Sequence, residues 1–171
     1  MVTKVIIVTG TPGTGKTRLA KAIAKAKHYD YVDVNKVIAS KKLSEGYDKK
    51  RKTKIINVSK LTAALLTIIA SAKKQGRKGI VIDSHLSHYL PKSAVDQCLV
   101  TRSELKTLQQ RLKKRGYGKA KIRENIDAEI FEVCLQEAQE QRHKISVVYT
   151  DNPLIKHSIK NNFQHIVRKL P

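Results

Sequence analysis

Short apolar runs alternate along this chain with longer segments whose apolar residues recur every three or four positions. The short runs have the pattern of buried β-strands, whereas the longer segments have helical periodicity. Strands that alternate with helices favour a mostly parallel sheet with helices packed on its faces. We therefore expect an α/β fold with three layers, α/β/α. Its five strands are expected at residues 4–9, 31–34, 79–83, 95–100 and 145–150.

The helical pattern is clearest at residues 18–27, 58–74 and 104–114. In the second of these segments, Leu61, Leu65 and Ile69 lie on one face, and Gly76 follows as a stop signal. A last helix is expected to begin at Pro153, because proline is favoured in the first helical turn. Its apolar face would comprise Ile155, Ile159, Phe163, Ile166 and Leu170.

The first expected strand leads into Gly10-Thr11-Pro12-Gly13-Thr14-Gly15-Lys16-Thr17, which matches G-x-x-x-x-G-K-[ST]. A strand before this motif and a helix after it are the context of a phosphate-binding loop. The glycines allow backbone N–H groups to point at phosphate oxygens, and the helix N-terminus adds its positive dipole end. A glycine-rich turn without a ligand is the alternative. The predicted nucleotide-binding residues are Gly10, Gly13, Thr14, Gly15, Lys16, Thr17 and the adjoining Arg18.

A carboxylate and two histidines follow the expected strand at residues 79–83. Asp83 ends an apolar run, as the metal-binding aspartate of phosphate-loop proteins does, and with Thr17 it could hold Mg²⁺. A turn or a helix cap is the alternative for this carboxylate. His85 and His88 either contact the same water and metal network or are ordinary loop histidines.

Arginines mark the second part of the candidate site. Arg115 ends the segment 104–114 and opens a basic stretch, so it is the best candidate for a cation that closes over a transferring phosphoryl group. It could equally be a solvated charge at a helix C-terminus. Arg102 could contact a phosphate or a nucleobase, and a structural role is the alternative there as well.

Charge points to anionic partners. Lys and Arg number 35 against 14 Asp and Glu, for a net charge of +21. This excess favours RNA, a ribosomal particle or polyphosphate substrates; a charged thermophile surface is the alternative. Cys98 and Cys134 have no metal-binding spacing and are interpreted as apolar core residues. With no apolar run long enough to span a membrane and no signal peptide pattern, we expect a cytoplasmic protein.

The motifs together resemble the adenylate kinase isoenzyme 6 family. The resemblance rests on residues 10–17, on Asp83-Ser84-His85-Leu86-Ser87-His88, and on Arg115-Gly116-Tyr117 with the following Glu124-Asn125-Ile126. It covers nearly the whole chain. It implies a P-loop NTPase fold of the nucleoside monophosphate kinase type, as a single domain over residues 1–171. A monophosphate-binding region would lie at about 34–53 and a lid at about 114–124.

The resemblance also implies a function. Such proteins transfer the γ-phosphoryl group of ATP to AMP or another nucleoside monophosphate, hydrolyse ATP, and bind a small-subunit ribosomal protein during ribosome maturation. Lys16, Asp83, His85 and Arg115 would be the catalytic residues. Ala39 departs from the family pattern, which has arginine there, and a lysine nearby could replace only the charge.

Two other functions remain open on the sequence. One is an assembly factor whose ATPase cycle controls binding to a ribosomal protein or rRNA, with little kinase output. The other is a kinase that acts on the 5′ ends of polynucleotides, which the basic charge would also suit.

Overall fold

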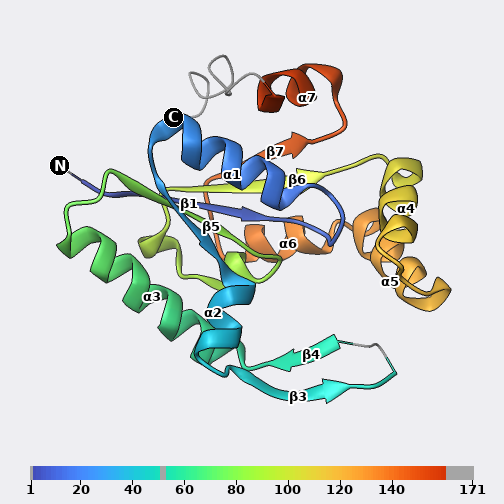
Figure 1. Ribbon diagram of the computed structural model, residues 1–171, viewed down its shortest axis with the longest axis horizontal. Helices are drawn as coiled ribbons and strands as arrows, with labels where there is room; N and C mark the ends of the chain where they lie inside the picture. Colours follow the sequence, from blue (N-terminus) through green and yellow to red (C-terminus); the bar gives the residue numbers. More distant parts are fainter. Residues whose placement is uncertain (1, 51–52, 161–171) are drawn as a thin grey trace.

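The computed structural model describes residues 2–50 and 53–160 of the chain. Its centre is a five-stranded parallel sheet in the order β2-β5-β1-β6-β7 (Figure 1). The strands are β1 (Lys4–Thr9), β2 (Asp30–Asp33), β5 (Gly79–Asp83), β6 (Gln97–Arg102) and β7 (Ile145–Tyr149). All five expected strands are therefore confirmed, with β6 beginning and ending two residues later than expected.

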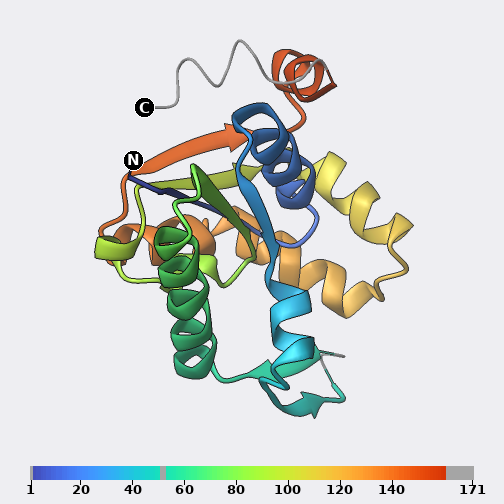
Figure 2. The same ribbon diagram turned by 60° about the vertical axis from the view of Figure 1, so that its left-hand side comes forward.

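Helices cover both faces of the sheet, as Figure 2 shows. On one face α1 (Lys16–Lys27) and α7 (Pro153–Lys160) pack against the strands, and on the other face α3 (Val58–Lys74) and α6 (Val133–Glu140) do so. Because alternate strand residues point to opposite faces, Ile6 and Val8 pack in the core on the α1 side and Val5 and Ile7 in the core on the α3 side. The predicted three-layer α/β/α architecture is confirmed.

The last helix begins at Pro153, as the sequence predicts. Its described part ends at Lys160, so the expected apolar positions Phe163, Ile166 and Leu170 lie outside the described residues.

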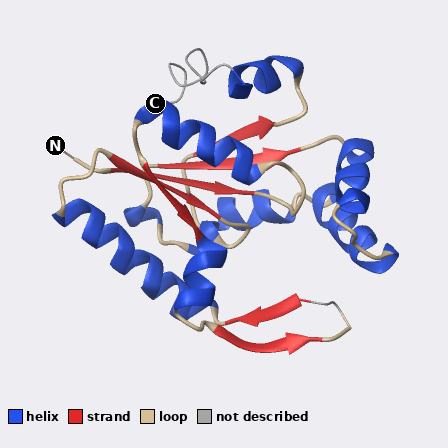
Figure 3. Ribbon diagram, viewed as in Figure 1, coloured by secondary structure: helices blue, strands red, loops and turns tan. Residues whose placement is uncertain are grey.

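A two-stranded hairpin stands apart from the main sheet (Figure 3). It consists of β3 (Ser44–Asp48) and β4 (Thr53–Ile56) and follows α2 (Val34–Ser40). The sequence did not predict these strands. Most of their side chains are exposed, so the alternation of apolar and polar residues that identifies a half-buried strand is missing.

Two helices form an arm beyond the carboxyl ends of β1 and β6 (Figure 1). They are α4 (Leu105–Lys114) and α5 (Lys119–Ile130), and they share a small core of Leu108, Leu112 and Ile122. Two short 3₁₀ turns, η1 (Ser87–Tyr89) and η2 (Lys92–Ala94), complete the fold.

The strand order creates a binding crevice. From β1 the chain passes to β2 and β5 on one side of the sheet and to β6 and β7 on the other. In open parallel sheets, ligands bind outside the carboxyl ends of the strands at such a switch point. The loop after β1, Asp83 at the end of β5, and the arm after β6 all lie at this edge.

Candidate active site

The loop between β1 and α1 is shaped by glycines. Gly10, Gly13 and Gly15 have φ angles of 136°, 98° and 93°, which other residues rarely adopt. A Cβ atom on Gly10 would lie 2.4 Å from the carbonyl oxygen of Thr101, and one on Gly13 would lie 2.7 Å from Cδ1 of Leu108. The loop therefore needs glycine both for its backbone conformation and for its packing.

Neighbouring elements hold this loop by side-chain hydrogen bonds. Thr150, just after β7, donates from Oγ1 to the Thr14 carbonyl oxygen at 2.6 Å. The Oγ1 atoms of Thr14 and Thr101 lie 2.6 Å apart. From α4, Nη1 of Arg111 donates to the Gly13 carbonyl oxygen at 3.3 Å. These contacts preorganise the loop, so little ordering would remain to be done when a phosphate binds.

Lys16 opens the first turn of α1, whose N-terminus carries no acidic residue. Its Nζ donates to the carbonyl oxygens of Gly10 at 2.8 Å and Thr11 at 3.0 Å. Burial lowers the pKa of this ammonium group to about 8. An ammonium group beside a helix N-terminus attracts anions, and an arriving phosphate would offset the cost of its burial.

Asp83 and Thr17 both interact with the hydroxyl of Tyr31. Asp83 is 5% exposed, and its Oδ2 accepts a hydrogen bond from Tyr31 Oη at 2.9 Å. Burial and then this hydrogen bond raise the pKa of Tyr31, whose hydroxyl also contacts Thr17. Carboxylate and hydroxyl oxygens are ligands that Mg²⁺ prefers, so the donors present fit this ion.

A cavity of about 590 Å³ lies over the loop, and residues that follow β1 and β5 border it together with residues of the arm. The predicted residues Lys16, Asp83, His85 and Arg115 all border it, although they come from three separate segments of the chain. Five cationic side chains among the described lining residues face one carboxylate, so the cavity favours a polyanion. The cationic residues are Lys16, Arg18, Lys21, Arg115 and Lys121.

The two histidines occupy different environments. His85 is exposed within the cavity; the surrounding protein and then the charge of Lys16 lower its pKa to about 4, so it is neutral at pH 7. His88 is fully buried, and its Nδ1 lies 2.7 Å from Oγ1 of Thr9. His85 therefore borders the cavity over the loop, whereas His88 packs beneath it.

Arg102 belongs to a structural network. Its Nε donates to Oε1 of Glu129 at 3.1 Å, and its Nη1 pairs with Glu132. Glu129, which is 3% exposed, also accepts a hydrogen bond of 2.6 Å from the Thr11 hydroxyl. Of the two roles considered for Arg102, the structural one is supported, because its guanidinium binds the carboxylates of Glu129 in α5 and Glu132 just before α6.

A second cavity of about 550 Å³ adjoins the first. Asn35, Thr53 and His85 border both cavities, so the two lie side by side. Its further walls come from α2, the hairpin, the start of α3 and the loop after β5, and they combine apolar side chains with a tyrosine and a lysine. These residues are Ile38, Tyr47, Lys54, Ile56, Val58 and Leu86.

Sequence reasoning missed several residues that shape the site. Tyr31, Arg111 and Thr150 carry no motif, and each contacts a segment far along the chain. The available signal was weak. Thr150 lies at the carboxyl end of an expected strand, where side chains that contact the loop after β1 are found, whereas Tyr31 begins its expected strand and had no such signal.

Comparison with known proteins places these features in context. Residues 6–132 match the family model described as AAA domain. A Dictyostelium discoideum protein named adenylate kinase isoenzyme 6 homolog is 34% identical over 134 residues, which are 78% of this chain and 73% of that protein. A Schizosaccharomyces pombe protein with the same name is 36% identical over 135 residues, 79% of this chain and 74% of its own.

Solved structures of low sequence identity share the fold. Shikimate kinase from Acinetobacter baumannii superposes with a TM-score of 0.64 at 12% identity, covering 98% of this chain and 95% of its own. Deoxyadenosine kinase from M. mycoides has a TM-score of 0.56 at 21% identity, covering 97% of each chain. Among the described helices, none combines the length and apolarity that crossing a bilayer requires.

Proposed function

The chain belongs to the adenylate kinase isoenzyme 6 family and is a phosphotransferase; from this premise, we propose that it transfers the γ-phosphoryl group of ATP to AMP, forming two ADP. The observation that carries the proposal is the pair of adjoining cavities, which share Asn35, Thr53 and His85. One contains the phosphate loop, and the other offers apolar walls of the kind a nucleobase needs. Two nucleotides bound in them would meet near His85, which borders both.

Each predicted residue receives a role in this proposal. The loop and Lys16 bind the β- and γ-phosphates, and Thr17 and Asp83 hold Mg²⁺, which neutralises phosphate charge when bound. Arg115 stabilises the negative charge of the transferring group. An oxygen of the AMP phosphate forms the new bond to phosphorus as the bond to the ADP oxygen breaks. Positioning and charge dominate such transfers, so the neutral His85 would orient the acceptor or a water molecule.

The proposed monophosphate-binding region at about 34–53 and the lid at about 114–124 remain predictions. In this reading Asn35 and Thr53 lie between donor and acceptor, and Arg115 follows α4 at the edge of the first cavity. ATP hydrolysis is the accompanying activity, which occurs when water takes the place of AMP. A cytoplasmic location is likewise a prediction.

The test is ATP turnover with and without AMP, with ADP and phosphate measured separately. A kinase makes two ADP for each ATP and AMP consumed and releases little phosphate. Lys16→Ala should abolish turnover, and Lys25→Ala, an exposed change on the same helix, should not. Phosphate release that ignores AMP would refute the kinase proposal, and full activity in Lys16→Ala would refute the site. Unchanged kinase and ATPase rates in His85→Ala would remove its role.

The second candidate is an ATPase that assembles with a ribosomal protein or rRNA. The net charge of +21 and the exposed Lys49, Lys50 and Lys54 around the hairpin favour it. It predicts phosphate release that rises with rRNA or a small-subunit ribosomal protein, and binding that weakens steeply with salt. Labelling of an RNA oligonucleotide at its 5′ end would instead support a polynucleotide kinase.

A further inference from the structure

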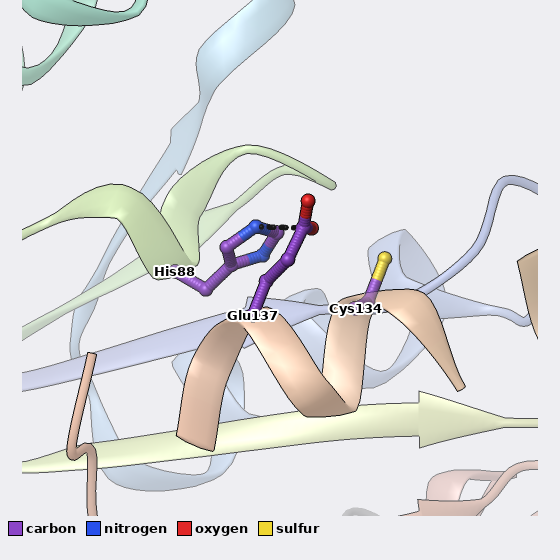
Figure 4. A group of neighbouring side chains, drawn as sticks. All are labelled: His88, Cys134 and Glu137. Atoms are coloured by element: carbon purple, nitrogen blue, oxygen red, sulfur yellow. Dashed lines mark ion pairs between the residues drawn. The ribbon is translucent and has the colours of Figure 1, made fainter. Parts of the chain in front are cut away.

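Three side chains with metal-binding atoms meet beneath the phosphate loop. His88 comes from η1, and Cys134 and Glu137 project from one face of α6 (Figure 4). Their ligand atoms all lie within 4.8 Å of one another. Because Cys134 and Glu137 are three residues apart in a helix, they are neighbours on its surface. The proposed phosphoryl transfer uses none of these side chains.

The buried ring of His88 has one nitrogen atom whose hydrogen-bonding capacity is not met among the described residues. Its Nε2 lies 2.9 Å from Oε2 of Glu137, yet within the described part of the chain it makes no hydrogen bond of acceptable geometry. His88 is 0% exposed, so water cannot readily serve this atom from outside. Buried polar atoms are nearly always satisfied, and an exception needs an explanation.

Neighbouring hydroxyl groups hold two side chains of the cluster by hydrogen bonds, as the outer contacts of a metal site do. Metal-binding imidazoles usually donate their other N–H to a protein oxygen, and here Nδ1 of His88 lies 2.7 Å from the hydroxyl of Thr9. Glu137 is also held, because Tyr89 Oη donates to its Oε1 at 2.8 Å. Both ligands are thus oriented by hydrogen bonds that leave one atom of each directed into the cluster.

The donor set selects the ion. Nitrogen, sulfur and carboxylate oxygen together suit Zn²⁺, which binds in a tetrahedron at about 2.0–2.3 Å. Such a tetrahedron separates its ligand atoms by about 3.3–3.8 Å. The side chains must therefore rotate so that their ligand atoms move by about 1 Å when the ion binds. A cavity of about 600 Å³, bordered by Thr11, His85, Cys134 and Glu137, leaves room for a fourth ligand.

We propose that His88, Cys134 and Glu137 form a zinc-binding site whose fourth position is open to this cavity. The inference does not depend on the kinase proposal, since it concerns a different set of residues. Zinc at this position would connect η1 and α6 directly beneath the residues that follow β1.

The test is metal binding by the chelator-treated full chain in the absence of nucleotide. Zinc is titrated against a chromophoric chelator, and Co²⁺ is added separately to look for a thiolate-to-cobalt charge-transfer band. The wild type should bind one zinc ion per chain and show the band. Cys134→Ala should remove the band and weaken zinc binding by more than the about 10- to 100-fold that loss of an outer contact of a metal site costs, and Glu137→Gln should weaken binding and keep the band.

Cys98→Ala is the matched control, because Cys98 is the other cysteine and lies buried in β6. It should keep both the band and the affinity. Circular dichroism of each metal-free variant verifies the fold. The proposal is overturned if the wild type binds no stoichiometric zinc, if Cys134→Ala binds as tightly as the wild type, or if the band depends on Cys98.

Discussion

Glu129 connects the arm to the phosphate loop, and replacing it with alanine should destabilise the whole domain. Its side chain is 3% exposed and accepts three hydrogen bonds from two other segments. The donors are the Thr11 hydroxyl at 2.6 Å, Arg102 Nε at 3.1 Å and the Ser103 backbone N–H at 3.2 Å. Glu129→Ala leaves all three donors without this carboxylate.

The structure sets the size of the effect. Removing one partner of a buried ion pair costs about 3–5 kcal/mol, because the remaining charge is left buried. Arg102 would keep two other partners, the side chain of Glu132 and the backbone carbonyl oxygen of Glu129. We therefore expect a loss near the lower limit, about 3 kcal/mol in the free energy of unfolding, or about 6–12 °C in Tm for a domain of this size.

Urea unfolding followed by circular dichroism measures this loss. Asp127→Ala is the matched control, because it removes one carboxylate from the same helix and its partner Arg123 is 80% exposed. An exposed pair of this kind contributes about 0.5 kcal/mol or less. A cost for Glu129→Ala below about 1 kcal/mol, or one no larger than the control, would refute the reasoning, provided that the m-value is unchanged.

Three other predictions concern the nucleotide sites and the loop. ATP binding should weaken about tenfold between pH 7 and pH 9, because Lys16 of the nucleotide-free protein loses its proton with a pKa of about 8 and must regain it when ATP binds. Calorimetric titrations should show no such dependence of the ATP affinity on pH for Lys16→Met. Ala39→Arg should lower the KM for AMP about tenfold and leave the KM for ATP unchanged, because Ala39 lies one helical turn from Asn35 at the acceptor cavity; an equal change in both constants would contradict this placement. Gly13→Ala should destabilise the fold more than Gly116→Ala in urea unfolding, because both glycines have positive φ but a Cβ only at Gly13 would clash with Leu108; equal losses would mean that the clash is relieved.

The parts of the fold that the sequence predicted have local signals. The phosphate loop is contiguous, and β1 and β5 are unbroken apolar runs because helices cover both faces of the sheet. Asp83, His85 and Arg115 were found because each lies at or just after the end of a strand or helix. Their common position around one cavity then followed from the parallel sheet. Their catalytic roles stay predictions.

The parts that could not be predicted depend on distant partners. The sequence does not reveal the partners of Glu129, because only the fold brings it to Thr11, 118 residues away. The contacts of Arg102 with Glu129 and Glu132, which decide between its two roles, likewise join segments far apart in the sequence. The hairpin was not predicted for another reason: its side chains are mostly exposed, so its sequence lacks the alternation of apolar and polar residues that identifies a strand. Exposure and long-range pairing are properties of the folded chain that no short window of sequence records.

The central position of β1 also sets the order in which this protein can assemble during synthesis. β1 pairs with β5 from Lys4 opposite Gly79, and with β6 from Ile6 opposite Gln97. The first strand to be made must therefore wait for both of its neighbours while about a hundred residues are added. Its apolar residues stay without their final partners during that time. A growing chain that ends before β6 would expose them to chaperones or to aggregation. Because the phosphate loop directly follows β1, nucleotide binding would indicate that β1 has paired with both of its neighbours.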